Sequence, residues 1–442
     1  MSTDRLDIIE KNLKSKSIEE YEIYLIEREN FETIFLKSQP ETEREVIDFE
    51  YFIRILKQKG EETGIGVVKG NSLDSGEILK NISTCRSISN YNTSSKYFFP
   101  ENKSFPKIIT ADANVLRDPI TIKNKLSQNL IETVKEQKDV VPTFGRFRLH
   151  NQKKFLRNSN GLNLDSVKTL FHIEFSLKAQ KNGKIAEYWT TGYFKEVDHL
   201  KFEERVENWA KLAKDMLIAE PPKPTKDALV VFPPHVLREA IIPVIGFHSL
   251  GKTFNEKISS YNLNDKVATE DISIIDDGLL KGGLGSSSWD GEGNPHQKSE
   301  IIKDGIFQKR LYDQKYAILE NIESTGNGRR VGNGSISNGI SNLQILPGDF
   351  SLENMISEIK EGYFINNFSW LNPEAISGFF GAEIRNGYYI KNGEIKNPIK
   401  GGNISGNILE MLKNCEFITN NTEFSENTLF PYMAFSNLTV SF

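Results

Sequence analysis

Apolar and polar residues follow two different periods in the first half of the chain, and the mixture predicts both helices and strands. Apolar residues three and four positions apart indicate helices over residues 4–16, around Ile78, Leu79 and Ile82, over 118–136 and over 202–218. Runs rich in β-branched and aromatic residues indicate strands at 22–27, 33–37, 52–56, 64–68, 144–150, 170–177 and 187–194. Groups of strands followed by long helices are typical of an α+β layer, with the helices on one face of a sheet.

The second half is predicted to be mostly β-sheet, because Asp-Gly and Asn-Gly dipeptides separate its short apolar runs. Such dipeptides favour tight hairpin turns. They occur at 277–278, 290–291, 304–305, 386–387 and 392–393. Residues 301–307 and 387–395 each resemble a complete hairpin, and only 236–248, 313–320 and 352–361 have helical spacing. The predicted fold class is therefore α+β, with an N-terminal α+β domain followed by a C-terminal domain built on a hairpin-rich, mostly antiparallel sheet.

Glycine and proline place the boundary between the two halves. Residues 1–220 contain 9 glycines, whereas residues 221–442 contain 23. Between them, residues 221–226 form a stiff, proline-rich and charged link of the kind that separates domains. We therefore predict two domains, 1–220 and 221–442.

The composition is that of an ordinary globular protein and argues against several classes of function. Apolar residues make up 38% of the chain and charged residues 26%, and the formal net charge is −5 without any block of Lys or Arg. This disfavours a nucleic acid or an anionic membrane as partner. The longest apolar stretch, 228–247, is interrupted by Pro233, Arg238 and Pro243, and the first residues lack the apolar run of a signal peptide.

Cysteine usage points to a reducing compartment. The two cysteines, Cys85 and Cys415, lie 330 positions apart and no Cys-x-x-Cys occurs, which excludes a disulfide framework and a Cys-rich zinc site. We therefore expect a cytoplasmic protein that does not cross a membrane.

Residues 246–253 match the phosphate-binding pattern Gly-x-x-x-x-Gly-Lys-Thr, with Gly246, Gly251, Lys252 and Thr253 at the defining positions. The bulky residues between the glycines and the helix-like run before them contradict the strand–loop–helix context that this pattern requires. The plain interpretation is a helix C-terminus stopped by Gly251. The six histidines show no metal-binding spacing, and His235 and His248 flank one predicted helix, too far apart to share a metal.

Two further features allow both a functional and an ordinary interpretation. Glu239 is an acid in an apolar helix; it is either a general base or metal-site carboxylate, or a charge paired with its neighbour Arg238 or turned to solvent. Arg329 and Arg330 end a glycine-rich loop and either clamp a carboxylate or phosphate of a peptide or partner, or are exposed charges on an ordinary surface loop.

Several short segments together resemble the TldD/PmbA family. The segments are Val236-Leu-Arg-Glu-Ala-Ile-Ile-Pro243, 276–278, 289–295, 301–306, Ser324-Thr-Gly-Asn-Gly-Arg-Arg330, 346–348, 392–398 and 404–407. Their order and spacing resemble the C-terminal domain of that family from about residue 230 to 442, and residues 21–28 and 63–70 resemble its N-terminal α+β domain more loosely.

The resemblance also implies what the central helix does in TldD-like members. There a His-Glu-x-x-x-His motif binds the metal through two histidines, its glutamate serves as base, and a late cysteine completes the coordination. Aligned on this motif, the present sequence has Arg238 for the first histidine and Pro243 for the second, and only Glu239 remains. Residues 424–437 contain no cysteine, and Cys415 falls too early to match.

This pattern resembles the TldE (PmbA)-like branch, which implies a non-catalytic subunit. Its implied partners are a TldD-like metallopeptidase subunit and unstructured peptide substrates, and zinc is expected only in the TldD-like partner. Whether the chain has enzymatic activity of its own stays open at this point. Two alternatives also stay open: a stand-alone (metallo)peptidase with an unrecognised site, and a P-loop nucleotide-binding protein that uses residues 246–253.

Overall fold

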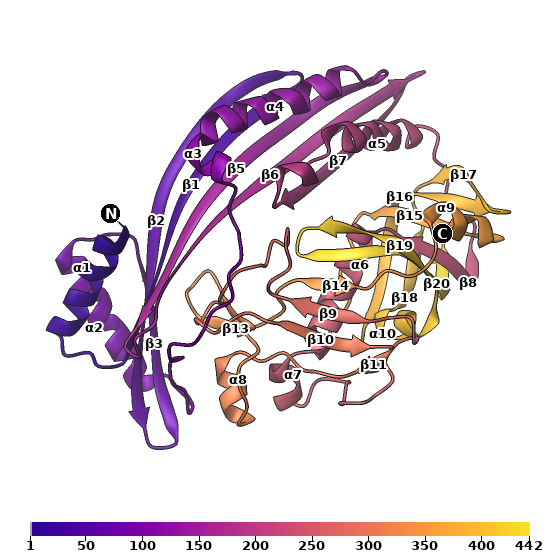
Figure 1. The fold of residues 1–442 in the computed structure, drawn as a ribbon. Coiled ribbons are helices and arrows are strands. Elements are labelled where there is room, and N and C mark those ends of the chain that lie inside the picture. Colours follow the sequence, from indigo (N-terminus) through magenta and orange to yellow (C-terminus); the bar gives the residue numbers. More distant parts are fainter. Residues whose placement is uncertain (1) are drawn as a thin grey trace.

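The computed structural model describes residues 2–442 and places most strands in two large sheets (Figure 1). The first sheet has seven strands in the order β4-β3-β2-β1-β5-β6-β7, and every neighbouring pair is antiparallel. Its strands are β1 (Tyr21–Leu36), β2 (Gln39–Lys59), β3 (Glu62–Gly70), β4 (Thr93–Ser95), β5 (Val140–Asn158), β6 (Asn163–Lys181) and β7 (Lys184–Phe194). The long strands arch over the second half of the chain (Figure 1).

The helices of the first half cover one face of this sheet. They are α1 (Ser2–Ser15), α2 (Ser75–Tyr91), α3 (Ala113–Arg117), α4 (Pro119–Lys135) and α5 (Phe202–Asp215), with a short 3₁₀ turn at Val197–His199. On β1, Ile23 packs with α1 and α2, and Phe31 packs with α4 and α5. Side chains alternate between the two faces of a strand, so these odd-numbered residues share one face and the even-numbered ones face the other way.

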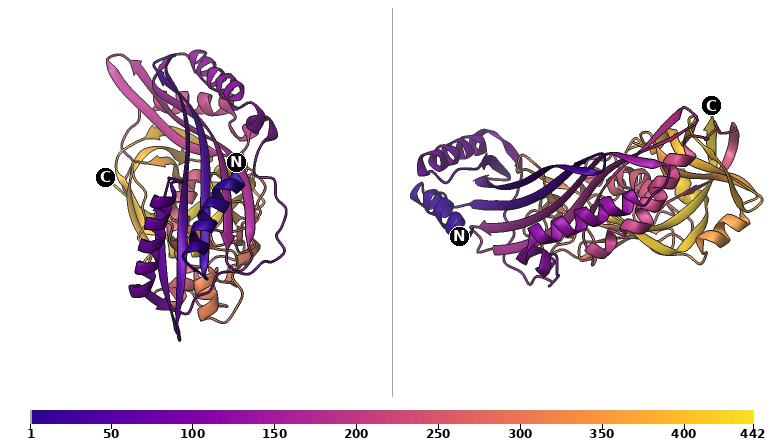
Figure 2. Two further views of the ribbon diagram at one scale, coloured as in Figure 1. Left: turned by 90° about the vertical axis from the view of Figure 1, so that its left-hand side faces the viewer. Right: turned by 90° about the horizontal axis from the view of Figure 1, so that it is seen from above.

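The even-numbered face of β1 turns toward the second half of the chain. Tyr24 packs edge-on against Trp289, with their rings 6.1 Å apart, in a cluster that includes Leu156 of β5. Figure 2 shows the resulting elongated molecule, in which the N-terminal helices and the C-terminus lie at opposite ends.

The second sheet contains eleven strands, and part of it closes into a ring. The order β20-β18-β16-β15-β8 returns to β20, since β8 also pairs with β20. Two neighbouring pairs, β14 with β20 and β15 with β8, are parallel, and the others are antiparallel. The strands are β8 (Thr225–Phe232), β9 (Ile274–Asp277), β10 (Lys298–Lys303), β11 (Ile306–Phe307), β14 (Leu343–Ile345), β15 (Glu361–Phe368), β16 (Phe379–Lys391), β17 (Glu394–Ile399), β18 (Asn403–Asn407), β19 (Cys415–Ser425) and β20 (Thr428–Ser441). The predicted α+β class with a mostly antiparallel C-terminal sheet is confirmed.

The remaining elements are short. They are α6 (Pro234–Ile241), a π-helical turn at Ile242–Gly246, α7 (Gly251–Asn255), α8 (Gln314–Leu319), α9 (Leu352–Glu358), α10 (Ile408–Met411), a 3₁₀ turn at Leu412–Asn414, and the strand pair β12 (Gly328–Arg330) and β13 (Ile336–Asn338). Val236, Leu237 and Ile241 of α6 are buried in the core of the second sheet, as the apolar spacing predicted. The predicted helix 236–248 changes to a π-helical turn at Pro243, because proline lacks the N–H that would continue the α-helical pattern.

Of the five dipeptides predicted as hairpin turns, two join neighbouring strands and one lies inside a strand. Asp277-Gly278 begins the long connection from β9 to β10, and Asp290-Gly291 lies within it. Asp304-Gly305 joins β10 to β11, and Asn392-Gly393 joins β16 to β17. Asn386-Gly387 is not a turn, since β16 runs through it, and a Cβ at Gly387 would lie 2.6 Å from the carbonyl oxygen of Phe364. Glycine at this position therefore permits close strand approach.

The apolar core continues across the junction between the two sheets. Val206 and Trp209 of α5 belong to one buried cluster with Val231 and Phe364 of the second sheet. None of the helices in the described part of the chain combines the length and apolar character needed to cross a membrane.

Candidate functional site

Arg238 and Glu239 project from α6 on the side that its apolar residues leave free. Arg238 Nη1 lies 2.9 Å from Glu426 Oε2, and Arg238 Nη2 lies 3.6 Å from Glu239 Oε1. Glu426 stands in the turn between β19 and β20 with φ of 53°, a left-handed conformation. The pairing of Glu239 with its neighbour, expected as the ordinary interpretation, is therefore present, although Glu426 is the closer partner.

These residues do not fit a metal ion. A guanidinium group has no free lone pair and proline has no ligand atom in its side chain, so positions 238 and 243 supply no donor. The carboxylate of Glu426 is held by Arg238, which leaves Glu239 as a single donor beside a fixed positive charge. Among residues 2–442, no group of three or more His, Cys, Asp or Glu side chains has an arrangement that could hold a metal ion.

Glu239 is the one member of this group that can still exchange a proton. Its side chain is 43% exposed. Its pKa lies above the ordinary value because partial burial disfavours the charged form, and the negative charge of Glu426 adds to the effect while Arg238 opposes it. A carboxyl group in this setting can accept a proton.

The two arginines of the glycine-rich segment have different environments. Arg329 is exposed on β12. The side chain of Arg330 is only 4% exposed, and its Nη2 lies 2.5 Å from Glu22 Oε1 of β1. Arg330 also donates hydrogen bonds to the carbonyl oxygens of Gly291 and Gly334, and its guanidinium lies over the ring of Tyr24. Arg330 is thus committed to the first sheet of its own chain, and the predicted peptide or partner contact can be made at the surface only by Arg329.

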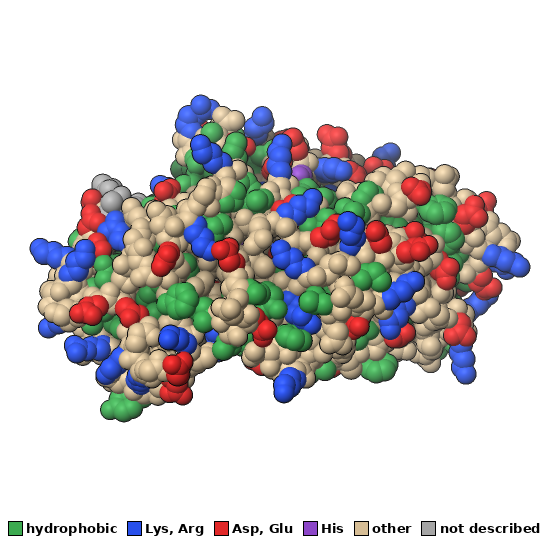
Figure 3. Space-filling view, turned by 60° about the horizontal axis from the view of Figure 1, so that its bottom comes forward, with side chains coloured by type: hydrophobic (Ala, Val, Ile, Leu, Met, Phe, Trp, Pro, Cys, Tyr) green, Lys and Arg blue, Asp and Glu red, His purple; other side chains and the backbone are tan. Residues whose placement is uncertain are grey.

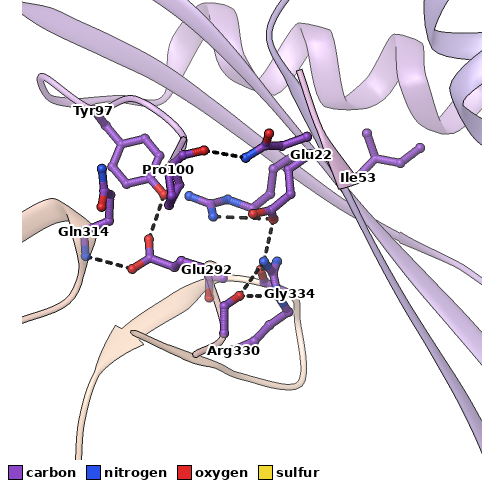
Figure 4. Close-up of polar contacts among 12 residues, drawn as sticks. Glu22, Ile53, Tyr97, Pro100, Glu292, Gln314, Arg330 and Gly334 are labelled. Atoms are coloured by element: carbon purple, nitrogen blue, oxygen red, sulfur yellow. Dashed lines mark hydrogen bonds and ion pairs between the residues drawn. The ribbon is translucent and has the colours of Figure 1, made fainter. Parts of the chain in front are cut away.

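Arg330 belongs to a buried polar group that joins the first sheet to loops and the β12–β13 pair of the second half of the chain, which we call the interface cluster: Glu22, Arg54, Tyr97, Glu292 and Arg330. Arg54 Nη1 lies 3.5 Å from Glu22 Oε1, and the Tyr97 hydroxyl donates to Glu292 Oε1 at 2.7 Å. Figure 4 shows Glu22 and Tyr97 of the first half of the chain next to Glu292 and Arg330 of the second half, and the backbone N–H of Gln314 also donates to Glu292. Each buried charge in the cluster therefore has a hydrogen-bond or ionic partner.

The electrostatics of the cluster follow from its burial. Burial raises the pKa of Glu292, although Arg54 opposes this, and burial also raises the pKa of Tyr97 well above its usual value. The pKa values of the neighbouring Asp290 and Asp313 are raised by burial and by the charge of Glu292. Carboxyl groups with raised pKa values also occur in catalytic sites. Here Asp290 accepts the backbone N–H of Asn294, and Asp313 accepts that of Tyr316, which is a structural use.

The histidines are held by hydrogen bonds to the backbone or to nearby side chains. His235 contacts the carbonyl oxygen of Asn366 at 2.6 Å, and His248 contacts that of Ile376 at 3.0 Å. Burial lowers the pKa of His235 to about 4, so it is neutral at pH 7. His199, near the end of the first sheet, lies 3.7 Å from Glu196 and stacks on Phe424.

The segment 246–253 has no phosphate-binding geometry. A helix precedes it, and the side chains of His248 and Thr253 are buried. The Thr253 hydroxyl donates to the carbonyl oxygens of Phe247 and Leu250, so it forms hydrogen bonds within the segment rather than facing a ligand. The expectation that Gly251 stops a helix is wrong, since Gly251 begins α7; a Cβ there would lie 2.2 Å from the ring of Tyr312.

The interface cluster is the feature that sequence reasoning missed. Its one available signal was Glu22, an acid inside a strand-like run with apolar neighbours, whose side chain is fully buried. Its partner Arg330 lies 308 positions away. No periodicity connects two residues at that separation.

A comparison with protein families matches residues 225–442 to the PmbA/TldA metallopeptidase C-terminal domain. A metalloprotease TldD homolog of Buchnera aphidicola (subsp. Acyrthosiphon pisum) is 36% identical over 183 residues, which cover 40% of this chain and 38% of that relative. The metalloprotease PmbA of Escherichia coli O157:H7 is 28% identical over 166 residues, or 38% of this chain and 35% of that relative. The matched region thus spans less than two fifths of these relatives.

Solved structures share the fold over almost the whole length. The crystal structure of TldE from Thermococcus kodakarensis has a TM-score of 0.87 at 20% identity and covers 99% of both chains. A putative modulator of a DNA gyrase from Thermotoga maritima has a TM-score of 0.84 at 21% identity and covers 100% of both chains. At these identities the likeness concerns the fold.

Proposed function

Residues 225–442 belong to the PmbA/TldD family, and from this premise we propose that the chain is a TldE-like, non-catalytic subunit. It pairs with a TldD-like metallopeptidase, and the complex cleaves flexible peptides. The metal and the catalytic residues belong to the partner, and this chain contributes binding surface. The cysteine usage supports a cytoplasmic location as part of the same proposal.

The observation that carries the proposal is the ion pair of Arg238 with Glu426. Arg238 lies on the helix that resembles the metal-binding helix of the family, and its guanidinium holds the nearest carboxylate at 2.9 Å. A cation at this place would meet like charge and would have to displace Arg238 from its partner. The fold of TldE from Thermococcus kodakarensis, which matches over 99% of this chain, supports the same branch of the family.

Reconstitution of peptidase activity tests the proposal. The chain is produced alone and together with a TldD-like metallopeptidase from the same genome, and the cleavage of an unstructured fluorogenic peptide is measured. We expect no cleavage by the chain alone and chelator-sensitive cleavage by the pair. Glu239→Gln in this chain should change the rate of the pair by less than about twofold, because a residue outside the reacting centre contributes little to transition-state stabilisation.

The controls separate this function from the alternatives. Glu353→Gln, an exposed glutamate of α9, serves as the matched variant for Glu239→Gln. The proposal is falsified if the chain alone cleaves the peptide and loses that activity in Glu239→Gln, since the chain would then be a peptidase in its own right.

A further inference from the structure

Three lysines form a row across the face of the first sheet that turns toward the second. They are Lys154 on β5, Lys168 on β6 and Lys195 directly after β7, and we call them the lysine row. Lys154 pairs with Ile26 of β1. Ile26 follows Tyr24 by two residues, so Lys154 is on the same face of the sheet as Tyr24. Lys168 pairs with Gln152, two residues from Lys154, so both point to that face. His172, four positions after Lys168, points to the same face and pairs with Tyr193 of β7. Lys195 follows Tyr193 by two positions and is therefore on this face as well.

Two members of the lysine row, Lys168 and Lys195, contact backbone carbonyl oxygens. The Lys168 ammonium donates to the carbonyl oxygen of Leu284, in a loop of the second half of the chain. The Lys195 ammonium donates to the carbonyl oxygens of Thr110 and Thr169, the latter at 2.9 Å. Among the described residues, no carboxylate lies within ion-pair distance of Lys154, Lys168 or Lys195.

Burial makes this lack of counter-charge costly. Lys195 is 7% exposed. Burial and the neighbouring Lys154 lower its pKa to about 7, against the opposing effect of Glu196. Burial and the charges of Lys154 and Lys195 lower the pKa of Lys168 well below its usual range, and Lys154 and Lys168 also lower that of the nearby His296. An ammonium in this situation gains more than an exposed one from an added anion.

The charge imbalance is local. On the same face of the sheet, Arg54 and Arg330 of the interface cluster share the carboxylate of Glu22. On the surface shown in Figure 3, acidic and basic side chains are interspersed. Lys195, which is buried without a carboxylate partner, therefore differs from the paired charges of the interface cluster.

A pocket borders the same strand and the same loop. It has a volume of about 350 Å³ and is lined by Phe105 to Ile108, by Asn163, Leu164 and Asp165 of β6, and by Ser288 and Trp289. Leu164 lies four positions before Lys168 on β6, about 13 Å along the strand, and points to the same face, whereas Asn163 and Asp165 point to the other face. Ser288 follows Leu284, the acceptor of Lys168, in the loop. The three lysines do not line the pocket themselves, so an extended chain that lies in it would reach the lysine row with one end.

We propose that the lysine row binds a carboxylate of a peptide that lies in this pocket. The carboxylate replaces the carbonyl contacts of Lys168 and Lys195 and supplies the missing negative charge. It is either an acidic side chain or the C-terminal carboxylate of the peptide. This inference rests on the proposed function, because it names the substrate class of a peptide-processing complex: peptides with a carboxylate at one defined position.

Peptide binding by the full chain tests the inference without any peptidase partner. Three short fluorescein-labelled Gly/Ser peptides are titrated and followed by fluorescence anisotropy: one with glutamates and an amidated C-terminus, one with glutamines and an amidated C-terminus, and one with glutamines and a free C-terminal carboxylate. We expect at least one carboxylate-bearing peptide to bind about tenfold more tightly than the neutral one, as charge-assisted hydrogen bonds imply. Which of the two it is identifies the source of the carboxylate.

Lys168→Met and Lys195→Met separate a binding role from a structural one. Each should remove the preference for the carboxylate peptide while its melting temperature stays level or rises, because an unpaired buried ammonium is replaced by an apolar side chain of similar length. Lys178→Met, on the same strand but outside the row, is the matched control and should keep the preference.

Three results would overturn the inference. They are equal binding or no binding of all three peptides, a preference that survives in both lysine variants, and a fall in melting temperature that accompanies an unchanged preference. A failed reconstitution with a TldD-like partner would overturn the proposed function instead, and would leave the measured carboxylate preference standing.

Discussion

The interface cluster and the lysine row lie against the same face of the first sheet, but their buried charges differ in whether they have partners of opposite charge. In the interface cluster the buried carboxylate of Glu22 lies between the guanidinium groups of Arg54, on the first sheet, and Arg330, on β12 of the second half. In the lysine row three ammonium groups stand together, and the contacts of Lys168 and Lys195 are neutral carbonyl oxygens. A fully paired buried charge holds two elements together, whereas an unpaired one costs stability unless something else binds.

This difference suggests how to distinguish structural from binding charges in the absence of any ligand. Replacement of a structural charge by an apolar side chain should destabilise the protein, because its partner is left buried and alone. Replacement of a binding charge should leave stability level or raise it. The variants below are ordered by the size of the expected effect.

Arg330→Met should have the largest effect. It leaves the fully buried Glu22 with only the longer contact to Arg54, at 3.5 Å, and should lower the free energy of unfolding by about 3 kcal/mol. Arg329→Met, at the exposed neighbouring position, is the control and should stay within about 0.5 kcal/mol of the parent. Urea denaturation at neutral pH measures both. If the two variants lost the same amount, the distinction between the two regions would fail at its first step.

Asp313→Asn sharpens the comparison through pH. Asp313 accepts the N–H of Tyr316 at the start of α8, and asparagine can cap the helix equally well. Its pKa is raised in the folded protein by burial and by Glu292, so its contribution to stability is present at acidic pH and is lost as pH rises above about 4 through the folded pKa. The asparagine variant should therefore gain about 1–2 kcal/mol relative to the parent between about pH 5 and pH 8. A constant difference in unfolding free energy over that range would contradict this.

Lys195→Met should show the opposite pH dependence of stability to Asp313→Asn. The pKa of Lys195 in the folded protein is lowered to about 7. The buried charge therefore lowers the free energy of unfolding of the parent at and below pH 7, and this loss disappears as pH rises toward the unfolded pKa near 10. The charges that act on it are Glu196, Lys154 and Lys168. The stability of the variant relative to the parent should thus be highest near pH 6 and fall by about 1 kcal/mol toward pH 10, in thermal unfolding across that range. A relative stability that rises with pH would place Lys195 with the structural charges.

The sequence predicted the fold class better than the extent of its strands. Ile78, Val206 and Trp209 have helical spacing because one face of their helices is buried, and their helices were predicted. The longest strands, β2, β5 and β6, were predicted at less than half their length. The first ten residues of β2 are exposed on both faces, so their polarity does not alternate. These residues are held by backbone pairing with β1, which leaves no pattern in side chains.

The candidate site was predictable only where the argument was local. The prediction that metal ligands are missing rests on Arg238 and Pro243, which lie close together in the sequence. Glu426, which holds Arg238, lies 188 positions away, and nothing in the sequence points to it. The lysine row was not predicted for a similar reason. Single lysines on β5, on β6 and directly after β7 are typical of a solvated face, and the contact of Lys168 depends on a loop of the other half of the chain.

Arg238→Met should have the smallest effect on the free energy of unfolding, because it removes an ion pair that is only partly buried. Arg238 is paired, like Arg330, but its side chain is 25% exposed and that of Glu426 is 28% exposed. Water can solvate both carboxylates once the guanidinium is gone, so the loss in unfolding free energy should stay below about 1 kcal/mol. Glu426→Gln is the matched variant, and the double variant should cost no more than the larger single one, since the two changes remove the same ion pair. A loss above about 2 kcal/mol in urea denaturation would show that burial alone does not separate structural from dispensable pairs in this fold, and that α6 depends on its ion pair with Glu426.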